Sequence, residues 1–377
     1  MRILHTIPGR NWGGMEHRTI EQVRWLVANG HAVWLAAPAD GEPFKRAQAM
    51  GLPVVDFDFD RPWKASTVQA MRRLVRQYKI EVIDAHVTRD AKAALACLDL
   101  CALVRSRHVN QPLKPGWVRR LQWRLSDHII TVAECTREHL VEIGLADPAR
   151  STSIGGWADE RFFQLADPVA TRARLRSEIG LADDAFVLVC VGMLRPDKGQ
   201  NFLIDALGLL KAEGLTFTTL LAGSATAESA EYEQGLKEQA ARLDVDVRFL
   251  GYRDDVSELM QTGDGVVIPS LTEAQPRVAV QAFATAKPVV ACAVGGVPEI
   301  VKDGETGWLV PPAEPTQLAA AIARLVKDRE TAARVAANAR HLAEQAMRFD
   351  HRMNQTLETY RTAIRRAQSR PWVSVMP

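Results

Sequence analysis

Two cations stand in a loop of the second half of the chain where a diphosphate could bind. The apolar run 186–191 leads into Gly192, and Arg195 and Lys198 follow before an amphipathic segment begins at Gln200. We expect a strand followed by a helix here, so that both cations lie at the carboxyl end of the strand and at the N-terminus of the helix. Amide groups at a helix N-terminus and fixed positive charges together favour a bound anion. The loop therefore predicts a diphosphate site, although a solvated turn can have the same residues.

A carboxylate and an amide follow a later apolar run. Glu273 stands in the loop after the run that ends at Ile268, and Gln281 lies more than one turn into the helix expected from Pro276. A loop carboxylate at the carboxyl end of a strand can hold sugar hydroxyl groups, and a helical amide can hold a ribose. The alternative is that Glu273 only interacts with the positive end of the helix dipole, which is worth under about 1 kcal/mol.

The Gly13-Gly14 turn follows the first apolar run of the chain and comes just before a helix expected from about Glu16. Glycines at such a junction let the backbone approach a ligand, and the helix N-terminus attracts anions. A plain tight turn is equally compatible with two adjacent glycines.

These residues are carried by short apolar runs that alternate with amphipathic segments along the whole chain. This pattern is typical of βαβ units and parallel sheets, in which ligands bind at the carboxyl ends of the strands. The expected strands are Arg2–Ile7, Ala32–Ala36, Val54–Phe57, Glu81–Ala85, Val104–Val109, His128–Val132, Ser151–Ile154, Phe186–Val191, Phe217–Leu221, Val247–Leu250, Gly265–Ile268, Pro288–Ala291 and Trp308–Val310. We expect an α/β protein with two tandem doubly wound domains.

The domain boundary is expected in the segment 157–171, which has no clear periodicity. The predicted organisation is an N-terminal domain over residues 1–165, a second domain over 166–346, and a basic tail over 347–377. Lys and Arg outnumber Asp and Glu by 23 to 18 in the first segment and by 6 to 2 in the tail, whereas the middle has 18 basic and 25 acidic residues. We expect the basic part to face an anionic acceptor or a membrane.

The composition excludes several classes of protein. A chain with 47% hydrophobic and 24% charged residues is globular, and a formal net charge of +2 is too balanced for a nucleic-acid-binding protein. Five cysteines, odd in number and scattered among apolar runs, fit a reducing compartment better than a disulfide framework. The sequence has no pattern of a signal peptide or a membrane span, so we expect a cytoplasmic protein, either soluble or peripheral on the inner face of the cytoplasmic membrane.

Two further patterns allow more than one interpretation. The run Asp56-Phe57-Asp58-Phe59-Asp60 contains the D-x-D pattern of metal-dependent transferases, but it lies at the end of an alternating strand and no metal site is expected there. The stretch 114–124 interleaves aromatic and basic residues, which can seat a helix on an anionic bilayer or line a cleft. The candidate residues for this membrane or acceptor surface are Lys114, Trp117, Arg119, Arg120, Trp123 and Arg124.

A series of motifs along the chain resembles glycosyltransferase family 4. The motifs are Gly13-Gly14, Asp84-Ala85-His86, Gly192-x-x-Arg195-x-x-Lys198-Gly199, Gly251-Tyr252-Arg253, Pro269-Ser270-x-x-Glu273, Gly295-Gly296-Val297-Pro298-Glu299 and Gly304-x-x-Gly307. They occur in the family's order over nearly the whole chain, and the match is strongest from Gly192 to Pro312. The resemblance implies the GT-B fold, in which two Rossmann-like domains face a cleft and a C-terminal helix crosses back to the N-terminal domain. It also implies a retaining reaction that needs no metal and no cofactor.

The resemblance assigns roles to individual residues. Arg195 and Lys198 would hold the donor diphosphate, Glu273 would contact the donor sugar, and His86 would lie beside the transferred sugar. Without the motif, a lone histidine such as His86 is usually a packed residue. The other donor-binding residues that the resemblance implies are Gly13, Gly14, Gly192, Gly251, Tyr252, Arg253, Gln275, Arg277, Val278 and Gln281.

Two positions depart from the family pattern. Gln281 replaces the second Glu of the family's motif, and Ala274-Gln275-Pro276 replaces the Gly-Phe-Gly that commonly follows the first. A glutamine still offers a hydrogen-bond acceptor but loses about 1–2 kcal/mol of charge-assisted strength. We expect an altered donor geometry rather than an inactive enzyme.

The expected function is transfer of a hexose from a nucleotide sugar, UDP-linked, to a glycan or lipid-linked acceptor in cell-envelope polysaccharide or lipopolysaccharide synthesis. The expected mechanism is attack on the face that the diphosphate leaves, with a donor phosphate oxygen accepting the proton of the acceptor. Two alternatives remain: a sugar-nucleotide 2-epimerase, which would need acid–base carboxylates on both walls of the cleft, and a sugar-nucleotide-binding protein without activity.

Overall fold

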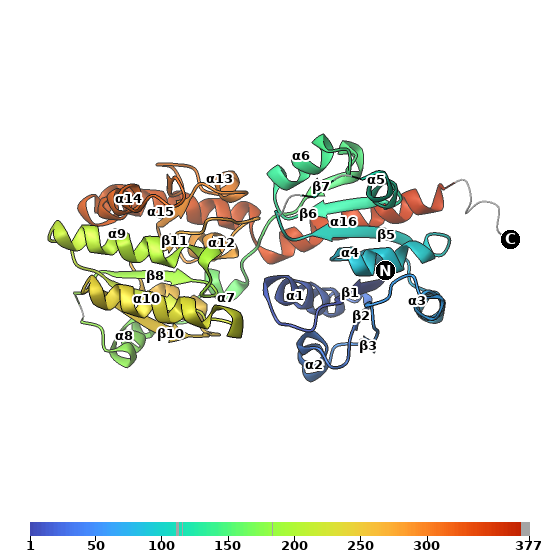
Figure 1. The fold of residues 1–377 in the computed structure, drawn as a ribbon, viewed down its shortest axis with the longest axis horizontal. Coiled ribbons are helices and arrows are strands. Elements are labelled where there is room, and N and C mark those ends of the chain that lie inside the picture. The colour runs from blue at the N-terminus through green and yellow to red at the C-terminus, as the bar shows by residue number, and fades with distance from the viewer. Residues whose placement is uncertain (111–112, 115, 183, 371–377) are drawn as a thin grey trace. The chain divides into compact units, whose positions relative to one another are not determined.

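The computed structural model describes residues 1–110, 113–114, 116–182 and 184–370 (Figure 1). The chain forms two compact units. Unit 1 comprises residues 1–154 together with the chain from Met353 onward, and unit 2 comprises residues 155–352. Unit 1 carries 26 Lys and Arg against 17 Asp and Glu, whereas unit 2 carries 21 against 28. The charge segregation expected from the sequence therefore follows the structural division.

Unit 1 is built on a parallel sheet of seven strands in the order β3-β2-β1-β4-β5-β6-β7. The strands are β1 (Arg2–Thr6), β2 (Ala32–Ala37), β3 (Val54–Asp56), β4 (Val82–Ala85), β5 (Ala102–Arg107), β6 (His128–Thr131) and β7 (Ser151–Ser153). The helices are α1 (Gly14–Ala28), α2 (Glu42–Ala49), α3 (Ala65–Tyr78), α4 (Thr88–Ala94), α5 (Trp117–Arg124), α6 (Glu134–Glu142) and most of α16 (Phe349–Gln368). The strand order reverses between β1 and β4, which is the point where doubly wound sheets bind ligands.

Unit 2 is built on a parallel sheet of six strands in the order β10-β9-β8-β11-β12-β13. The strands are β8 (Val187–Val191), β9 (Thr218–Ala222), β10 (Asp246–Gly251), β11 (Gly265–Ile268), β12 (Val289–Cys292) and β13 (Trp308–Val310). The helices are α7 (Glu160–Phe163), α8 (Pro168–Ile179), α9 (Gln200–Ala212), α10 (Ala230–Arg242), α11 (Val256–Thr262), α12 (Arg277–Ala284), α13 (Val297–Ile300), α14 (Pro315–Lys327) and α15 (Arg329–Ala346). Here the order reverses between β8 and β11.

Strand β8 shows why the central strands read as uninterrupted apolar runs. Val187 and Val189 belong to the hydrophobic core on one face of the unit 2 sheet, and Leu188 and Cys190 belong to the core on the other face. Successive side chains point to opposite faces, so a strand covered by helices on both sides needs an apolar residue at every position. The prediction of two tandem Rossmann-like domains is confirmed.

The boundary between the units lies earlier than the expected division at residue 165. Trp157 and Phe162 are fully buried in unit 2, and Met347 packs into the same hydrophobic core as Phe162. The backbone N–H of Ala158 donates to the carbonyl oxygen of Met347 at 3.0 Å. The aromatic residues at the start of the segment in which we expected the domain boundary are thus part of the core of unit 2, and they pack without following a helix or strand period.

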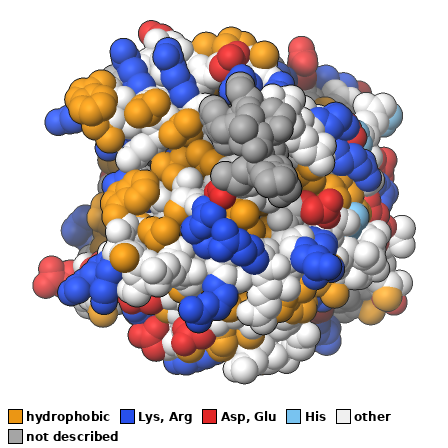
Figure 2. All heavy atoms as spheres, turned by 90° about the vertical axis from the view of Figure 1, so that its right-hand side faces the viewer, with side chains coloured by type: hydrophobic (Ala, Val, Ile, Leu, Met, Phe, Trp, Pro, Cys, Tyr) orange, Lys and Arg blue, Asp and Glu red, His pale blue; other side chains and the backbone are white. Residues whose placement is uncertain are grey.

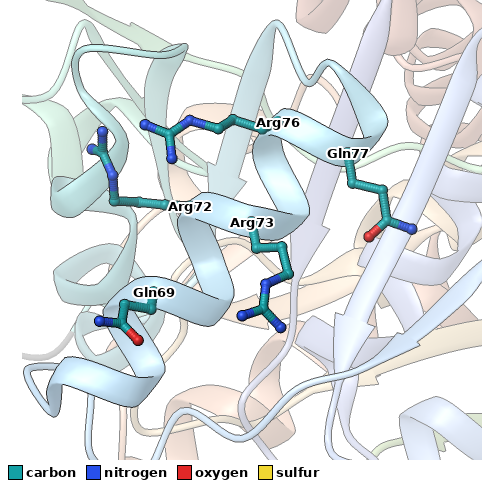
Figure 3. A pocket seen from close by; sticks show the side chains of 5 residues that line it. All are labelled: Gln69, Arg72, Arg73, Arg76 and Gln77. Atoms are coloured by element: carbon teal, nitrogen blue, oxygen red, sulfur yellow. The ribbon is translucent and has the colours of Figure 1, made fainter.

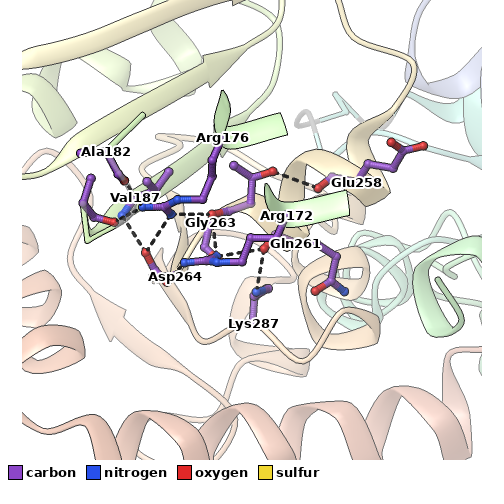
Figure 4. Close-up of polar contacts among 11 residues, drawn as sticks. Arg172, Arg176, Ala182, Val187, Glu258, Gln261, Gly263, Asp264 and Lys287 are labelled. Carbon is purple, nitrogen blue, oxygen red and sulfur yellow. Dashed lines mark hydrogen bonds and ion pairs between the residues drawn. The ribbon is translucent and has the colours of Figure 1, made fainter. Parts of the chain in front are cut away.

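The amino ends of β8 and β11 are tied together by a polar cluster (Figure 4). Arg172 Nη1 donates to the carbonyl oxygens of Gln261 and Thr262, the last two residues of α11, and of Gly263, which follows the helix, at 2.7 to 3.2 Å. Arg172 Nη2 also contacts Asp264 Oδ1 at 2.7 Å. The other carboxylate oxygen of Asp264 accepts from the backbone N–H of Val187 at 2.9 Å. Structural contacts therefore fill this end of the sheet, and the polar residues with predicted chemistry lie at the carboxyl ends.

Candidate active site

At the carboxyl ends of β8, β9 and β10, glycine residues bring the main chains of the three strands close together. A Cβ atom on Gly223 would lie 1.9 Å from the carbonyl oxygen of Gly192, so no residue with a side chain fits at position 223. The backbone N–H of Gly223 donates to the carbonyl oxygen of Gly251 at 2.8 Å. Nothing lies within 4 Å of a Cβ atom built on Gly192. The predicted donor-binding Gly192 is therefore half-buried main chain with open space on the side where a Cβ atom would stand.

The loop after β8 carries both predicted cations into the start of α9. Arg195 Nη2 contacts Asp197 Oδ2 at 2.7 Å, and a single 3-10 turn over Pro196–Lys198 leads to Gly199. Gly199 has φ of 65°, and a Cβ atom there would lie 2.1 Å from the carbonyl oxygen of Pro269. Only glycine allows this close approach, which holds the N-terminus of α9 against the loop that follows β11.

The two loops bring Lys198 and Glu273 together. Lys198 Nζ lies 2.6 Å from Glu273 Oε1, which also accepts a hydrogen bond from Ser270 Oγ at 2.8 Å. The backbone N–H of Leu271 donates to the carbonyl oxygen of Asp197 at 2.9 Å. The side chain of Lys198 is 22% exposed and that of Glu273 is 14% exposed. A cation and a carboxylate thus share a partly covered position at the carboxyl ends of β8 and β11.

Tyr252 and Arg253 follow directly after β10. Tyr252 is 59% exposed. Arg253 Nε donates to Asp255 Oδ1 at 2.8 Å, and the arginine lies 3.8 Å from Glu178. An exposed tyrosine beside a fixed guanidinium provides a stacking surface for a base. Their role in binding the nucleotide stays a prediction.

The predicted donor-binding residues around α12 occupy different environments. The side-chain oxygen of Gln275 accepts a hydrogen bond from the backbone N–H of Gly156, so this amide is held by the first residues of unit 2. The guanidinium of Arg277 lies 5.8 Å from the centre of the Trp157 ring. Val278 and Gln281 are half-buried on α12. The helix begins at Arg277, one residue later than expected, because Pro276 takes the N-cap position.

In unit 1, the Gly13-Gly14 turn forms the start of α1, which begins at Gly14 rather than at Glu16. A Cβ atom on Gly13 would lie 3.1 Å from Glu16 Oε2, and one on Gly9 would lie 3.2 Å from Glu16 Oε1. The carboxylate of Glu16 therefore covers the turn, and burial raises the pKa of this group. Hydroxyl groups suit this position better than phosphates, because a phosphate would meet a carboxylate there.

His86 follows β4 and is buried within a chain of histidine rings. His5 on β1 is paired in register with Asp84 on β4, and both point to the same face as His86. His5 Nδ1 lies 3.1 Å from His86 Nε2, and His86 Nδ1 lies 2.8 Å from His108 Nε2. Burial lowers the pKa of His5 and of His86 to about 3. Sequence reasoning missed His5 and His108, although both stand at the carboxyl ends of strands that flank β4.

A metal ion is one possible occupant of this cluster. Among the described residues, His5, Asp84 and His86 each offer a ligand atom, and these atoms lie within 4.8 Å of one another. However, the facing nitrogens of His5 and His86 are within hydrogen-bond distance, and the guanidinium of Arg18 is close enough to lower the pKa of His86. A neighbouring cation disfavours a divalent ion, so the geometry supports a hydrogen-bonded chain.

The D-x-D carboxylates at the end of β3 have backbone and arginine partners. Asp56 Oδ1 accepts from the backbone N–H of Ala39 at 2.9 Å, and Asp58 Oδ1 accepts from that of Asp60 at 2.9 Å. Asp60 also contacts Arg89 at 2.7 Å. The three aspartates are exposed while the intervening phenylalanines are buried, which agrees with the predicted alternation.

Most residues of the predicted membrane or acceptor surface are exposed, and its role in binding a membrane or an acceptor stays a prediction. Trp117 is 79% exposed and Leu121 is 53% exposed on α5, and Lys114, Arg120 and Arg124 are exposed around them. Figure 2 shows a face of unit 1 on which hydrophobic side chains alternate with Lys and Arg side chains. Of the helices in the described part of the chain, none is long and apolar enough to cross a membrane.

Trp123 does not belong to this surface. It is 7% exposed and packs with Ile129 and Leu140, and the guanidinium of Arg105 lies 5.4 Å from its ring centre. Six residues after Trp117, it has rotated to the face of α5 that packs on unit 1, whereas Trp117 points to solvent. A hollow of about 420 Å³ opens beside it, with Arg124 and another arginine, Arg150, among its lining residues.

A second hollow, of about 570 Å³, lies along α3 (Figure 3). It is lined by polar side chains of that helix, among them Arg73 and Arg76. Arg72, which also lines it, is bound to Asp99 through two contacts of 2.5 and 2.6 Å. The end of α3 leads to the amino end of β4, so this hollow is remote from the carboxyl ends where the predicted residues gather.

Comparison with known proteins identifies the family of the chain. The family model described as Glycosyltransferase Family 4 matches residues 12–156, and the model described as Glycosyl transferases group 1 matches residues 171–342. The chain belongs to glycosyltransferase family 4. Each model matches one of the two sheets of this family 4 chain, so the family assignment covers both units.

Curated relatives of the family 4 chain include two proteins named D-inositol 3-phosphate glycosyltransferase. The one from Stackebrandtia nassauensis is 34% identical over 256 residues, which is 65% of this chain and 56% of the relative. The one from Nocardioides sp. is 32% identical over 63% of this chain and 54% of the relative. The family 4 chain thus spans little more than half the length of the curated relatives it matches.

Solved structures share the fold of the family 4 chain. A glycosyltransferase from Rickettsia africae superposes with a TM-score of 0.87 at 18% identity, covering 96% of this chain and 98% of that one. Anabaena HepE in complex with UDP superposes with a TM-score of 0.82 at 25% identity, covering 96% of this chain and 100% of HepE. HepE with UDP-glucose gives a TM-score of 0.79 at 26% identity over the same shares of the two chains. The GT-B fold expected from the resemblance is confirmed.

Proposed function

We propose that this family 4 protein is a retaining glycosyltransferase that moves a hexose from a UDP-sugar to a hydroxyl group of a glycan or lipid-linked acceptor. The observation that carries the proposal is the contact of 2.6 Å between Lys198 Nζ and Glu273 Oε1. It places a cation and a carboxylate at the carboxyl ends of adjacent strands, next to the N-terminus of α9. A nucleotide sugar has the matching groups, a diphosphate followed by a ring of hydroxyls.

In this proposal the donor diphosphate lies at the loop after β8. Arg195 and Lys198 offset the negative charge of the diphosphate, and the backbone beside Gly192 lets the phosphates approach closely. Both cations contact carboxylates, Asp197 and Glu273 respectively, so a bound diphosphate would compete for them. The solved HepE complexes with UDP and with UDP-glucose support a uridine nucleotide as the donor.

The proposed reaction breaks the bond between the anomeric carbon and the diphosphate oxygen and forms a bond from that carbon to the acceptor oxygen. The proton of the acceptor hydroxyl passes to an oxygen of the departing diphosphate. Glu273 holds a hydroxyl group of the sugar, and Arg195 and Lys198 stabilise the leaving group. The positive charge that the leaving group needs comes from these side chains and from backbone amides, and we propose no metal or cofactor in the reaction.

The acceptor in this proposal is anionic. Unit 1 carries an excess of nine positive charges, and the curated relatives have D-inositol 3-phosphate in their name. A phosphorylated acceptor, free or lipid-linked, matches that charge. With α5 resting on an anionic bilayer, the enzyme would work in the cytoplasm at the inner face of the membrane, as cell-envelope polysaccharide or lipopolysaccharide synthesis requires.

A screen of nucleotide sugars tests the proposal. Thermal-shift measurements with UDP-, GDP- and ADP-sugars identify the donor, and NMR of the products from the best donor shows the anomeric configuration. We expect stabilisation by a UDP-sugar, slow hydrolysis, and a product that retains the configuration. Epimerisation at C2 without an acceptor would support a 2-epimerase instead, and binding without any turnover would support an inactive binding protein.

A further inference from the structure

Two buried histidines in unit 1, His5 and His86, form a continuous chain through ring nitrogens with the half-buried His108. His5 Nδ1 lies 3.1 Å from His86 Nε2, and His86 Nδ1 lies 2.8 Å from His108 Nε2. The ring centres of His5 and His86 are 5.4 Å apart with planes only 9° apart. This separation is close to the largest that a 3.1 Å contact between two imidazole nitrogens allows, so the two rings meet edge to edge in nearly one plane. Such geometry suits a linear N–H···N hydrogen bond.

A chain of neutral imidazoles has two possible directions. Burial lowers the pKa of all three rings far below neutral pH, and Arg18 lowers the pKa of His86 and His108 further. In each facing pair, one nitrogen must carry the proton and the other must accept it. Either His5 donates to His86 and His86 donates to His108, or both bonds run the opposite way.

Asp84 favours one of these two directions. Its Oδ2 atom lies 4.0 Å from His5 Nδ1 and accepts a hydrogen bond from Tyr360 Oη at 2.6 Å. A carboxylate at this distance favours a proton on the nearer ring nitrogen, His5 Nδ1. His86 then accepts at Nε2 and donates from Nδ1 to His108 Nε2, which leaves the proton of His108 on Nδ1.

We propose that Asp84, acting through His5 and His86, is a positioning residue that makes His108 present an N–H from Nδ1 to an oxygen of the sugar substrate. Within the described part of the chain, His108 Nδ1 is buried and has no hydrogen-bond partner. A buried N–H without a partner costs free energy, which a ligand oxygen would recover. His108 comes just after β5, at the carboxyl edge where this fold binds ligands. The substrate part of this inference rests on the proposed function.

The test is NMR of the full chain labelled with ¹⁵N-histidine, because the two tautomers give distinct nitrogen resonances. We expect His86 and His108 to carry their protons on Nδ1 in the unliganded wild type. His128 serves as a reference within the same spectra. Its Nδ1 faces the guanidinium of Arg366 at 3.0 Å, so its proton must be on Nε2, which lies 2.8 Å from Thr152 Oγ1.

Two matched substitutions separate the charge of Asp84 from general disturbance. Asp84→Asn should raise the ratio of the Nε2–H to the Nδ1–H tautomer of His86 and His108 by about tenfold, as expected for the loss of one charge near 4 Å. Asp90→Asn neutralises a second buried carboxylate, which binds the backbone N–H of His86 at 2.8 Å rather than its ring. It should leave both tautomers unchanged, and His128 should not change in either variant.

The outcomes decide the inference independently of turnover. A wild-type spectrum with the protons of His86 and His108 on Nε2 would overturn it, even if Asp84→Asn failed to fold. Equal tautomer ratios in the wild type and Asp84→Asn would also overturn it. Addition of UDP-glucose should shift the His108 Nδ1 resonance and leave that of His128 unchanged. If saturating UDP-glucose causes no shift, the proposed contact between His108 and the sugar substrate is wrong. Correct tautomers without sugar transfer would refute the proposed function alone.

Discussion

Lys198 and Glu273 are in contact although they stand 75 positions apart in the chain. The contact arises because β8 and β11 are neighbours in the sheet and each loop leaves its strand at the carboxyl end. Gly199 allows the two loops to touch, since a Cβ atom there would collide with Pro269. Site geometry in unit 2 is therefore a direct consequence of strand order and of one glycine.

Glu273→Gln should reduce hydrolysis and transfer from UDP-glucose by about 100-fold or more, because the sugar loses a charged hydrogen-bond partner and Lys198 loses its counter-ion. Affinity for UDP should change less than about threefold. Steady-state kinetics and calorimetric titration measure the two effects. Glu258→Gln, which alters a carboxylate paired with Arg174 on the surface, is the control and should keep full activity. If the Glu273→Gln variant keeps the turnover of the wild type, Glu273 has no role in the reaction.

Much of the fold follows from local pattern. The strands over 265–268 and 308–310 have the predicted bounds, and β8 differs by one residue, because uninterrupted apolar runs are a strong signal for buried parallel strands. The position of Trp157 could not be predicted, since its packing against Phe349 joins residues far apart in the chain. Local pattern carries no information on such long-range contacts.

The candidate site shows the same limit. The positions of Arg195, Lys198 and Glu273 at the carboxyl ends of strands could be predicted because each stands in a strand–helix loop with a recognisable motif. His5 and His108 could not, because nothing near them in the chain differs from an ordinary strand end. Their contact with His86 depends on the order of β1, β4 and β5 in the sheet, which the pattern of a single strand does not contain.

Acid should destabilise unit 1 through its buried histidines. The pKa of His5 is lowered from 6.5 to about 3. Between these two pH values His5 is therefore protonated in the unfolded state and neutral in the folded state. Stability present above pH 6.5 is lost as the pH falls toward 3, at about 1 kcal/mol per pH unit for each such group. The free energy of unfolding, measured by urea unfolding between pH 6 and pH 4, should fall with decreasing pH less steeply in His5→Gln than in the wild type. The difference should be about 1 kcal/mol per pH unit. Exposed His341→Gln should keep the wild-type slope, and equal slopes in both variants would contradict a neutral buried His5.

Removing Asp264 should destabilise unit 2 by about 2–3 kcal/mol, because Asp264→Ala leaves the buried guanidinium of Arg176 and that of Arg172 without their carboxylate. Urea unfolding followed by tryptophan fluorescence measures the loss. Glu178→Ala, which breaks an exposed pair with Arg174, should cost less than about 1 kcal/mol. Equal losses in the two variants would show that the cluster at the amino ends of β8 and β11 is not a structural clamp.

Binding of α5 to membranes should depend on its exposed apolar residues and on anionic lipid. Exchange of both Trp117 and Leu121 for Ser should weaken binding to vesicles that contain anionic phospholipid by at least about tenfold, since each side chain contributes about 1–3 kcal/mol when buried in the interface. Co-sedimentation with vesicles measures this effect. Trp63→Ser, which alters another exposed tryptophan of unit 1, is the control. If vesicle binding by the wild type does not depend on anionic lipid, the proposed membrane role of α5 is wrong.

Calorimetric titration of the full chain with UDP and with uridine tests the central claim most directly, because the two ligands differ only in the diphosphate. The account predicts that Arg195→Ala and Lys198→Ala each weaken UDP binding by about tenfold or more while the affinity for uridine stays nearly unchanged. Equal losses for UDP and uridine, or no measurable binding of UDP to the wild type, would contradict a diphosphate site at the loop after β8.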